Sequence, residues 1–360
     1  MSMNNRLILL QKFLSKNNLD AVIVKKLENV YYFSGFTGTT GMLLITKKGE
    51  YLLTDFRYIE QANGEAANYK VINCVKNVYT AIIEILEQDQ SLNVGFEGEY
   101  FTYNDYFKLN KLKKNLKYKN INLDELRSIK DEEEIAHLRK AVNIADRAFE
   151  HILSYIKPGR SEIEVAVELE IFMRRLGSQK NAFSTIVASG IRGALPHGVA
   201  TEKIINEGEL VTLDFGAVYK GYHSDITRTI CVGPVEEKQQ QLYDFVLQAQ
   251  LLGVKTLKPG VSGQFVDEVV RRYIMNGGYG QFFGHGLGHG VGLEIHEFPR
   301  LSPASMCDSL KPMMVVTVEP GVYLPGWGGI RIEDTVMVTT EGCEVLTKSS
   351  KHLIEIDLNL

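Results

Sequence analysis

Apolar residues in the first third of the chain switch between helical and strand spacing. The pattern predicts a surface helix over residues 1–18 and a strand over Ala21–Val24. Two apolar runs joined by a Lys-Lys-Gly turn predict a β-hairpin over residues 42–54, and a helix over 79–87 and a strand over 93–96 follow. We therefore expect a mixed α/β domain in this part of the chain.

A second pattern begins near residue 124, where a long amphipathic helix is predicted. Ser128 is its expected cap, and acidic side chains fill its first turns. A second helix over residues 162–176 ends at Gly177. Further elements are expected as strands over 186–188, 210–215, 225–232, 315–319 and 329–338, and as helices over 239–256 and 264–275. Helices precede strands twice, which hints at an internal duplication, and we expect domains over 1–123 and 124–360.

Length and composition also fit two globular domains. At 360 residues the chain exceeds the usual size of one hydrophobic core. It is 44% hydrophobic and 23% charged with a formal net charge of -4, and the lysine-rich residues 108–119 fit an exposed helix face. Because no sustained basic patch is present, we expect neither a nucleic-acid-binding nor a membrane-surface protein.

The sequence leads us to expect no targeting segment and no cysteine motif. The apolar run Leu7–Leu10 is too short for a signal-peptide core, and no segment approaches a membrane span, so we expect a cytoplasmic protein. The four cysteines lie far apart without a CxxC pair. The sequence therefore indicates neither a disulfide framework nor a thiolate zinc site.

Two pairs of carboxylates lie in otherwise apolar strand patterns. Asp214 lies within Leu210–Gly216, where an unpaired carboxylate is costly to bury. Asp225 opens the next predicted strand beyond a turn, so a hairpin would bring the two carboxylates together. Glu319 and Glu333 form a second pair of this kind. Like charges side by side repel unless a cation lies between them.

A glycine-rich segment with three histidines lies between these pairs. In His285–His296, alternate glycines allow a close backbone approach and place histidines at 285, 289 and 296. Four carboxylates and one imidazole suit two divalent ions with shared carboxylates and a bridging hydroxide as the nucleophile. The segment is not a phosphate loop, because the strand, helix and acidic context of a dinucleotide fingerprint is missing. The residues together predict a dinuclear metal site.

At these residues the sequence resembles the pita-bread family of dinuclear metallopeptidases, which contains methionine aminopeptidase, aminopeptidase P and prolidase. The segment His285–Glu297 resembles the proline-peptidase signature, and five candidate ligands follow the family's order: Asp214, Asp225, His289, Glu319 and Glu333. The resemblance implies that Asp225 and Glu333 bridge two ions and that Asp214 chelates one of them. His289 and Glu319 would complete the other ion, and Glu319 would handle the proton of the attacking water. Manganese is the expected ion, and cobalt, zinc and iron suit the same ligands.

The resemblance extends to residues around the metal site. Ala194–Gly198 is similar to the stretch that supplies a substrate-contacting histidine, here His197. His285 and His296 would line the substrate side, with His296 placed to hydrogen-bond the scissile carbonyl or its oxyanion. Tyr323 and Arg331 match positions next to the ligands and the substrate. The residues expected to act in catalysis are His197, His285, His296, Glu319 and Arg331, and those expected to bind substrate are His197, His296, Tyr323 and Arg331.

Two N-terminal segments, residues 31–38 and 54–58, resemble the domain that accompanies proline-specific members of this family. Methionine aminopeptidases of the fold generally lack that domain. The resemblance therefore implies an α/β (α+β) protein with a smaller creatinase-like α/β domain before a catalytic pita-bread domain. It also implies a homodimer, an N-terminal domain that narrows the active-site mouth, and cleavage of an Xaa-Pro bond, which general peptidases handle poorly.

The resemblance leaves several functions open. Aminopeptidase P removes the N-terminal residue from peptides with proline second, and residues 34–38 and 54–58 favour it. Prolidase uses the same ligands on Xaa-Pro dipeptides alone, and it needs a group that blocks or binds the free proline carboxylate, which the sequence does not locate. An inactive pita-bread binding module and a metal-free hydrolase such as creatinase are disfavoured, because all five candidate ligands are present.

Overall fold

The computed structural model describes residues 3–75, 77–113 and 115–357, which belong to two compact units, Met1–Arg127 and Ser128–Leu360. Met1 and Ser2 of the predicted first helix, and Lys114 of the lysine-rich run, lie outside the described residues. The first unit extends past residue 123 because the Asp124 carboxylate accepts hydrogen bonds from Lys26 at 2.6 Å and Asn29 at 3.0 Å. No helix among the described residues is long and apolar enough to cross a membrane.

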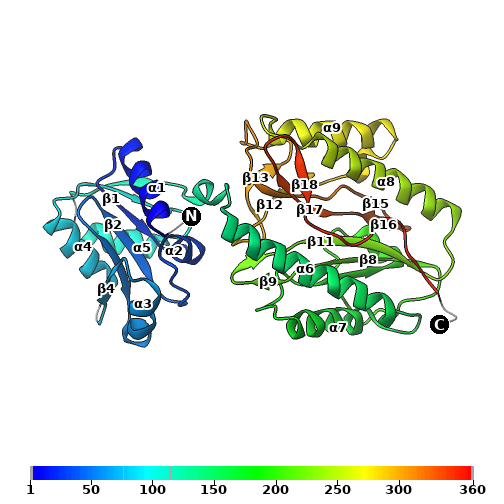
Figure 1. The fold of residues 1–360 in the computed structure, drawn as a ribbon, viewed down its shortest axis with the longest axis horizontal. Helices are drawn as coiled ribbons and strands as arrows, with labels where there is room; N and C mark the ends of the chain where they lie inside the picture. The colour runs from blue at the N-terminus through cyan, green and yellow to red at the C-terminus, as the bar shows by residue number, and fades with distance from the viewer. Residues whose placement is uncertain (1–2, 76, 114, 358–360) are drawn as a thin grey trace. The chain divides into compact units, whose positions relative to one another are not determined.

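The first unit is built on a six-stranded mixed sheet (Figure 1). Its strands are β1 Ala21–Val24, β2 Met42–Thr46, β3 Glu50–Thr54, β4 Lys70–Asn73, β5 Asn93–Phe96 and β6 Lys117–Asn120. Its helices are α1 Met3–Lys16, α2 Leu27–Ser34, α3 Ile59–Glu65, α4 Val78–Gln88 and α5 Tyr103–Leu112. The strand order is β4-β3-β2-β1-β5-β6, with β1, β2 and β3 antiparallel and the outer strands parallel to their neighbours. All four residues of β1 are buried, so both faces of the sheet are covered.

Over its described residues, the second unit contains four long helices, two larger sheets and two small hairpins. Its helices are α6 Glu132–Tyr155, α7 Glu162–Arg175, α8 Glu237–Thr256 and α9 Gly263–Asn276. One sheet has the order β19-β11-β8-β7, from Glu355–Ile356, Ile226–Val232, Glu209–Phe215 and Ile186–Ser189. The other has the order β13-β12-β14-β17-β18, from Glu297–Leu301, Gly288–Gly290, Val315–Val318, Asp334–Val338 and Cys343–Val345. The hairpins pair β9 Val218–Tyr219 with β10 Tyr222–His223, and β15 Gly321–Leu324 with β16 Gly328–Arg331.

Each larger sheet of this unit buries side chains against its own pair of helices. Phe149 of α6 and Leu169 of α7 share a core with Leu213 of β8. Residues of α8 and α9 share a second core with β14 and β17. In Figure 1, α6 and α7 lie on one side of the strands and α8 and α9 on the other. Because side chains alternate along a strand, Asp214 points away from the core that contains Leu213 and Phe215.

Three predicted elements differ from the structure. The lysine-rich residues 108–119 do not form one helix face, because α5 ends at Leu112 and residues 117–119 lie in β6. Asp131, rather than Ser128, caps α6, because its side chain accepts the Glu134 amide while the Glu134 carboxylate accepts the Asp131 amide. The strand predicted over 329–338 is two strands, β16 and β17, with a break at Ile332 and Glu333. The Glu333 amide instead donates to the Thr227 carbonyl of the other sheet at 3.1 Å.

Candidate metal centre

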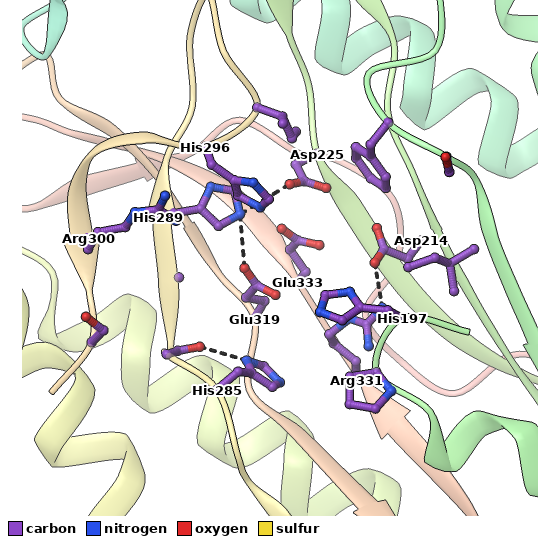
Figure 2. Close-up of a pocket in the computed structure, with 18 of the residues that line it drawn as sticks. His197, Asp214, Asp225, His285, His289, His296, Arg300, Glu319, Arg331 and Glu333 are labelled. Carbon is purple, nitrogen blue, oxygen red and sulfur yellow. Dashed lines mark hydrogen bonds and ion pairs between the residues drawn. The ribbon is translucent and has the colours of Figure 1, made fainter. Parts of the chain in front are cut away.

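The five predicted ligands come from strand ends of both larger sheets, and the structure brings them together (Figure 2). Asp214 lies in β8 opposite Thr227, and Asp225 directly precedes β11. His289 lies in β12. The two glutamates lie just outside strands, with Glu319 after β14 and Glu333 between β16 and β17. The strand predicted over 225–232 begins one residue later, after Asp225, and the strand predicted over 315–319 ends one residue earlier, before Glu319. Both ligands therefore lie just outside the regular ladder.

Two buried threonines orient the glutamates. The Thr227 hydroxyl donates to Glu333 Oε2 at 2.7 Å. The Thr317 hydroxyl donates to Glu319 Oε1 at 3.1 Å and accepts the backbone amide of His289 at 3.0 Å. Both threonines are fully buried, so the glutamates are held by short side chains with few alternative rotamers. Such contacts orient ligands in the way that outer-shell partners of metal sites do.

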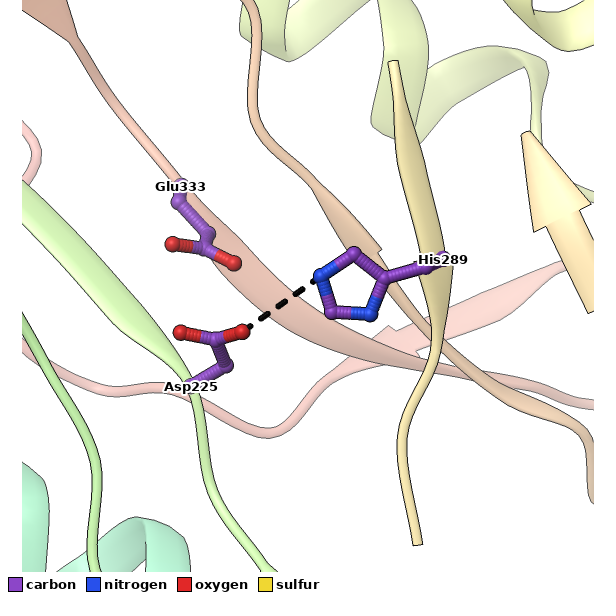
Figure 3. A group of neighbouring side chains, drawn as sticks. All are labelled: Asp225, His289 and Glu333. Atoms are coloured by element: carbon purple, nitrogen blue, oxygen red, sulfur yellow. Dashed lines mark ion pairs between the residues drawn. The ribbon is translucent and has the colours of Figure 1, made fainter. Parts of the chain in front are cut away.

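Asp225, His289 and Glu333 form the tightest group, with one ligand atom of each within 4.8 Å of the others (Figure 3). His289 Nε2 lies 3.5 Å from Asp225 Oδ2 and 3.2 Å from Glu319 Oε1. His289 Nδ1 lies 3.1 Å from the Gly290 carbonyl oxygen, which only accepts hydrogen bonds. Nδ1 therefore carries a proton, and Nε2 is the nitrogen that faces the carboxylates.

The carboxylates of the centre have strongly displaced pKa values. Burial, followed by the negative charge of Glu333, raises the pKa of Asp225 well above its ordinary value. Burial, followed by the charge of Glu319, does the same for Glu333. Burial alone would raise the pKa of Glu319, but its hydrogen bond with His289 lowers that pKa to about 2. The protein alone therefore does not balance the charge at Asp225 and Glu333.

The donor set fits divalent metal ions. Two buried carboxylate oxygens, Asp214 Oδ1 and Glu333 Oε1, have no hydrogen-bond partner among the described residues. An unpaired buried carboxylate oxygen is costly, and a cation relieves that cost together with the repulsion between neighbouring carboxylates. Carboxylates with one imidazole suit hard or borderline divalent ions. The residues present therefore fit divalent metal ions.

A buried chain of hydrogen bonds joins Arg331 to the glycine-rich segment. Arg331 donates to Asp214 Oδ2 at 2.5 Å and to the Tyr323 hydroxyl at 2.9 Å. The Tyr323 hydroxyl lies 2.8 Å from His285 Nε2, and His285 Nδ1 lies 2.8 Å from the Gly286 carbonyl oxygen. Both ring nitrogens of His285 are therefore engaged, and burial lowers the pKa of this histidine. Arg331, Tyr323 and His285 line the cavity, but their polar groups already form hydrogen bonds with one another, with Asp214 or with the Gly286 carbonyl.

A cavity of about 680 Å³ opens onto the ligands, a volume typical of small-molecule sites. His197 and His296 line it and are exposed, and among the described residues their ring nitrogens have no hydrogen-bond partner. The His296 ring lies against His289 with centroids 4.2 Å apart. Burial, followed by the charge of His289, lowers the pKa of His296 to about 4. Both histidines are thus available to a bound molecule.

The sequence analysis did not single out Arg300, which the structure places in the cavity wall (Figure 2). Arg300 lies in β13, and its exposed guanidinium has no acidic partner among the described residues. The sequence signal that could have identified Arg300 as a site residue is its position just after the histidine segment. An apolar stretch of wall was also missed, formed by Phe183, Ile186, Pro196, Val199 and Ile295. These residues are scattered over three segments, so no local pattern reveals them.

Comparisons with known proteins agree with this geometry. A model of metallopeptidase family M24 matches residues 136–340, and a model of the Creatinase/Prolidase N-terminal domain matches residues 6–129. An Xaa-Pro dipeptidase of Pyrococcus furiosus is 42% identical over 352 residues, which cover 98% of this chain and 100% of the relative. A solved Xaa-Pro dipeptidase from Bacillus anthracis is 46% identical, with a TM-score of 0.95 over 98% of this chain and 100% of that chain. An X-Pro aminopeptidase structure from Thermotoga maritima MSB8 is 36% identical, with a TM-score of 0.88 over 96% and 98%.

These matches confirm the predicted fold class and the resemblance to pita-bread metallopeptidases. They favour a dipeptidase over the aminopeptidase that the sequence analysis preferred, because the relatives named dipeptidases share more residues with this chain. The chain belongs to metallopeptidase family M24 and is a metallopeptidase with a Creatinase/Prolidase N-terminal domain.

Proposed function

We propose that this metallopeptidase is an Xaa-Pro dipeptidase. The observation that carries the proposal is Arg300, an exposed guanidinium in the cavity wall with no acidic partner among the described residues. A dipeptide carries its free carboxylate on the proline itself, close to the scissile bond. A guanidinium binds a carboxylate through two parallel hydrogen bonds, so Arg300 supplies the group that a dipeptide-specific enzyme requires.

The metal roles in this proposal are those that the resemblance implies. Asp225 and Glu333 would be shared between two divalent ions, Asp214 would bind one of them, and His289 and Glu319 would bind the other. When bound, the ions supply polarisation of the scissile carbonyl and activation of the attacking water. The close group of Asp225, His289 and Glu333, and the unpartnered oxygens of Asp214 and Glu333, support these roles.

The other residues of the cavity bind and orient the substrate in this proposal. Glu319 handles the proton of the attacking water at Oε2, since Oε1 already contacts Thr317 and His289. His296 donates a hydrogen bond to the scissile carbonyl oxygen as negative charge develops there. His197, which lies on the irregular segment after β7, also contacts the substrate. Arg331, Tyr323 and His285 hold Asp214 and the glycine-rich segment in place.

The alternative is an Xaa-Pro aminopeptidase that also accepts longer peptides. The similarity to the Thermotoga maritima aminopeptidase favours it, at 36% identity. A longer peptide has an amide after proline, and Arg300 would then lack its carboxylate partner. Manganese as the native ion, a homodimer and a cytoplasmic location remain predictions of the sequence analysis and belong to the proposal.

One assay separates these functions. Metal-loaded protein is incubated with an Xaa-Pro dipeptide, an Xaa-Pro-Xaa tripeptide and a Met-Ala-Ser tripeptide, and the released amino acids are measured. Turnover of the dipeptide alone supports the dipeptidase. Turnover of the proline tripeptide favours the aminopeptidase, release of methionine favours a methionine aminopeptidase, and no turnover with any divalent ion favours a binding module.

A further inference from the structure

His197 lies on an irregular segment whose position depends on contacts from outside it. The segment follows β7, begins with the short helix η3 Gly190–Ala194, and continues to Thr201 with a single isolated β-bridge, between Val199 and Ile186, as its regular pairing among the described residues. Its internal hydrogen bonds are short-range, such as Val199 N to His197 O at 2.9 Å. Exposed irregular segments move readily unless other elements hold them. Something must therefore hold residues 189–201 where His197 lines the cavity.

Glu162, the first residue of α7, contacts both ends of this segment. Its side chain is fully buried. Oε1 accepts the amide and the hydroxyl of Ser189 at 2.8 and 2.9 Å. Oε2 accepts the amide and the hydroxyl of Thr201 at 3.2 and 2.8 Å. The Glu162 carboxylate thus connects Ser189, at the start of residues 189–201, to Thr201 at their end.

A third contact of the same carboxylate lies inside the segment. Arg192 forms an ion pair with Glu162 Oε2 and donates to the Val199 carbonyl at 2.9 Å. Lys203 donates to the Ser189 hydroxyl at 2.8 Å, which leaves that hydroxyl to donate to Glu162. The Glu162 carboxylate is thereby satisfied almost entirely by residues 189–201, as a buried charge requires.

The segment is also fixed against the strand that carries Arg331. Gly193 of η3 lies so close to β16 that a Cβ at this position would be 3.0 Å from the Gly329 amide nitrogen. Gly329 and Arg331 belong to the same short strand. A segment held by Glu162 at its ends and by β16 in its middle therefore has a defined position relative to the metal centre.

We propose that Glu162 is a positioning residue for His197: its buried carboxylate holds residues 189–201 so that the histidine meets the substrate. The inference rests on the proposed function, in which His197 contacts the substrate. Glu162 itself does not line the cavity and touches no predicted metal ligand in the contacts of its side chain.

The test is a double-mutant cycle with Glu162→Gln and His197→Ala. Gln keeps the shape of the side chain, but its amide group faces the Arg192 and Thr201 donors, so the segment loosens. We expect each single variant to lower kcat/KM for an Xaa-Pro dipeptide by about 10- to 100-fold, since small misplacements have effects of that size. The double variant should be no worse than His197→Ala alone.

Three controls accompany the cycle. Glu164→Gln makes the same change on the same helix, where the side chain bonds Ser161 and Arg160, and should retain full activity. The metal content of Glu162→Gln should equal that of the unmodified protein. If Glu162→Gln does not fold, Thr201→Val removes the hydroxyl that donates to Glu162 Oε2 at 2.8 Å and accepts the Lys203 amide at 3.3 Å. This variant should lower kcat/KM by about threefold, again only when His197 is present.

Hydrogen exchange separates failure of the inference from failure of the proposed function. The Ser189 and Thr201 amides should exchange faster in Glu162→Gln, whether or not the protein cleaves Xaa-Pro peptides. Unchanged exchange overturns the inference. So does unchanged kcat/KM in either single variant, or a double variant whose loss equals the product of the single losses. An unmodified protein that cleaves no Xaa-Pro peptide instead overturns the proposed function.

Discussion

The candidate metal ligands and the histidines of the cavity wall are held in different ways. The ligands lie at strand ends, where Asp225 is 5% and Glu333 2% exposed, and buried threonine hydroxyls orient the glutamates. His197 and His296 lie on irregular segments, are exposed, and have no ring hydrogen bond among the described residues. A metal centre needs fixed donors, whereas groups that bind and release a substrate must keep their polar atoms free.

Ion pairs with a buried carboxylate lie at both histidine segments. Glu162 and Arg192 form an ion pair at the segment that carries His197. Lys130 and Glu297, whose side chains are 1% and 2% exposed, pair at 2.6 Å next to His296. Such pairs are sensitive, because removing one partner leaves a buried charge without compensation. Changes at the sheets should therefore alter metal content, and changes at the segments should alter turnover with the metal content intact.

The largest effect should follow from loss of a bridging carboxylate. Asp225→Ala and Glu333→Ala should each lower kcat/KM by roughly 1,000-fold or more, about 4 kcal/mol of transition-state stabilisation, because a shared ligand is lost. Turnover and bound metal are measured together. Glu341→Ala, an exposed carboxylate of the same unit, serves as the control. Retained activity in both ligand variants would falsify the assignment of the bridging ligands.

Loss of His296 should be the next largest effect. His296→Ala should lower kcat by roughly 100- to 1,000-fold, the usual effect of removing one donor to a developing oxyanion. Its metal content should stay unchanged, since the ring contacts His289 without being a predicted ligand. Steady-state kinetics and metal analysis test this, and a variant that loses metal along with activity would place His296 with the ligands.

Loss of the Thr227 hydroxyl should weaken metal binding without removing a ligand. Thr227→Val keeps the shape of the side chain but removes the hydrogen bond to Glu333 Oε2 at 2.7 Å and the one from Arg331 Nε at 3.2 Å. We expect metal affinity to fall by roughly 10- to 100-fold, as for other outer-shell partners. Titration with Mn²⁺ measures this, and turnover should recover at saturating metal. Turnover that does not recover at saturating metal would mean that the hydroxyl acts through more than metal affinity, either directly or through its contact with Arg331.

Of these four changes to the site, the smallest effect should come from Arg300. Arg300→Ala should raise KM for an Xaa-Pro dipeptide by about tenfold, because an exposed charge-assisted contact contributes at the low end of its usual range. The same dipeptide with an amidated C-terminus lacks the carboxylate and should show no difference between the two proteins. An equal loss on both substrates would exclude recognition of the carboxylate by Arg300.

Much of the fold could be predicted from local patterns. The hairpin of β2 and β3 has apolar runs on both sides of a glycine turn, and its pairing is set by neighbours in the chain. The cap of α6 was assigned to Ser128 instead of Asp131, because several residues before a helix can cap it and only geometry selects one. The break at Ile332 and Glu333 was missed, because the competing partner, Thr227, belongs to the other sheet.

The sequence by itself determined which residues are candidate ligands, because carboxylates in apolar strands and histidines between glycines are costly without a shared cation. Only the tertiary structure decided which charges meet. Arg331 reaches Asp214 across 117 positions of the chain, Glu162 reaches Ser189 across 27, and Arg300 meets no acidic group among the described residues. Local patterns constrain neighbours in the chain, whereas these contacts depend on how the sheets and helices pack.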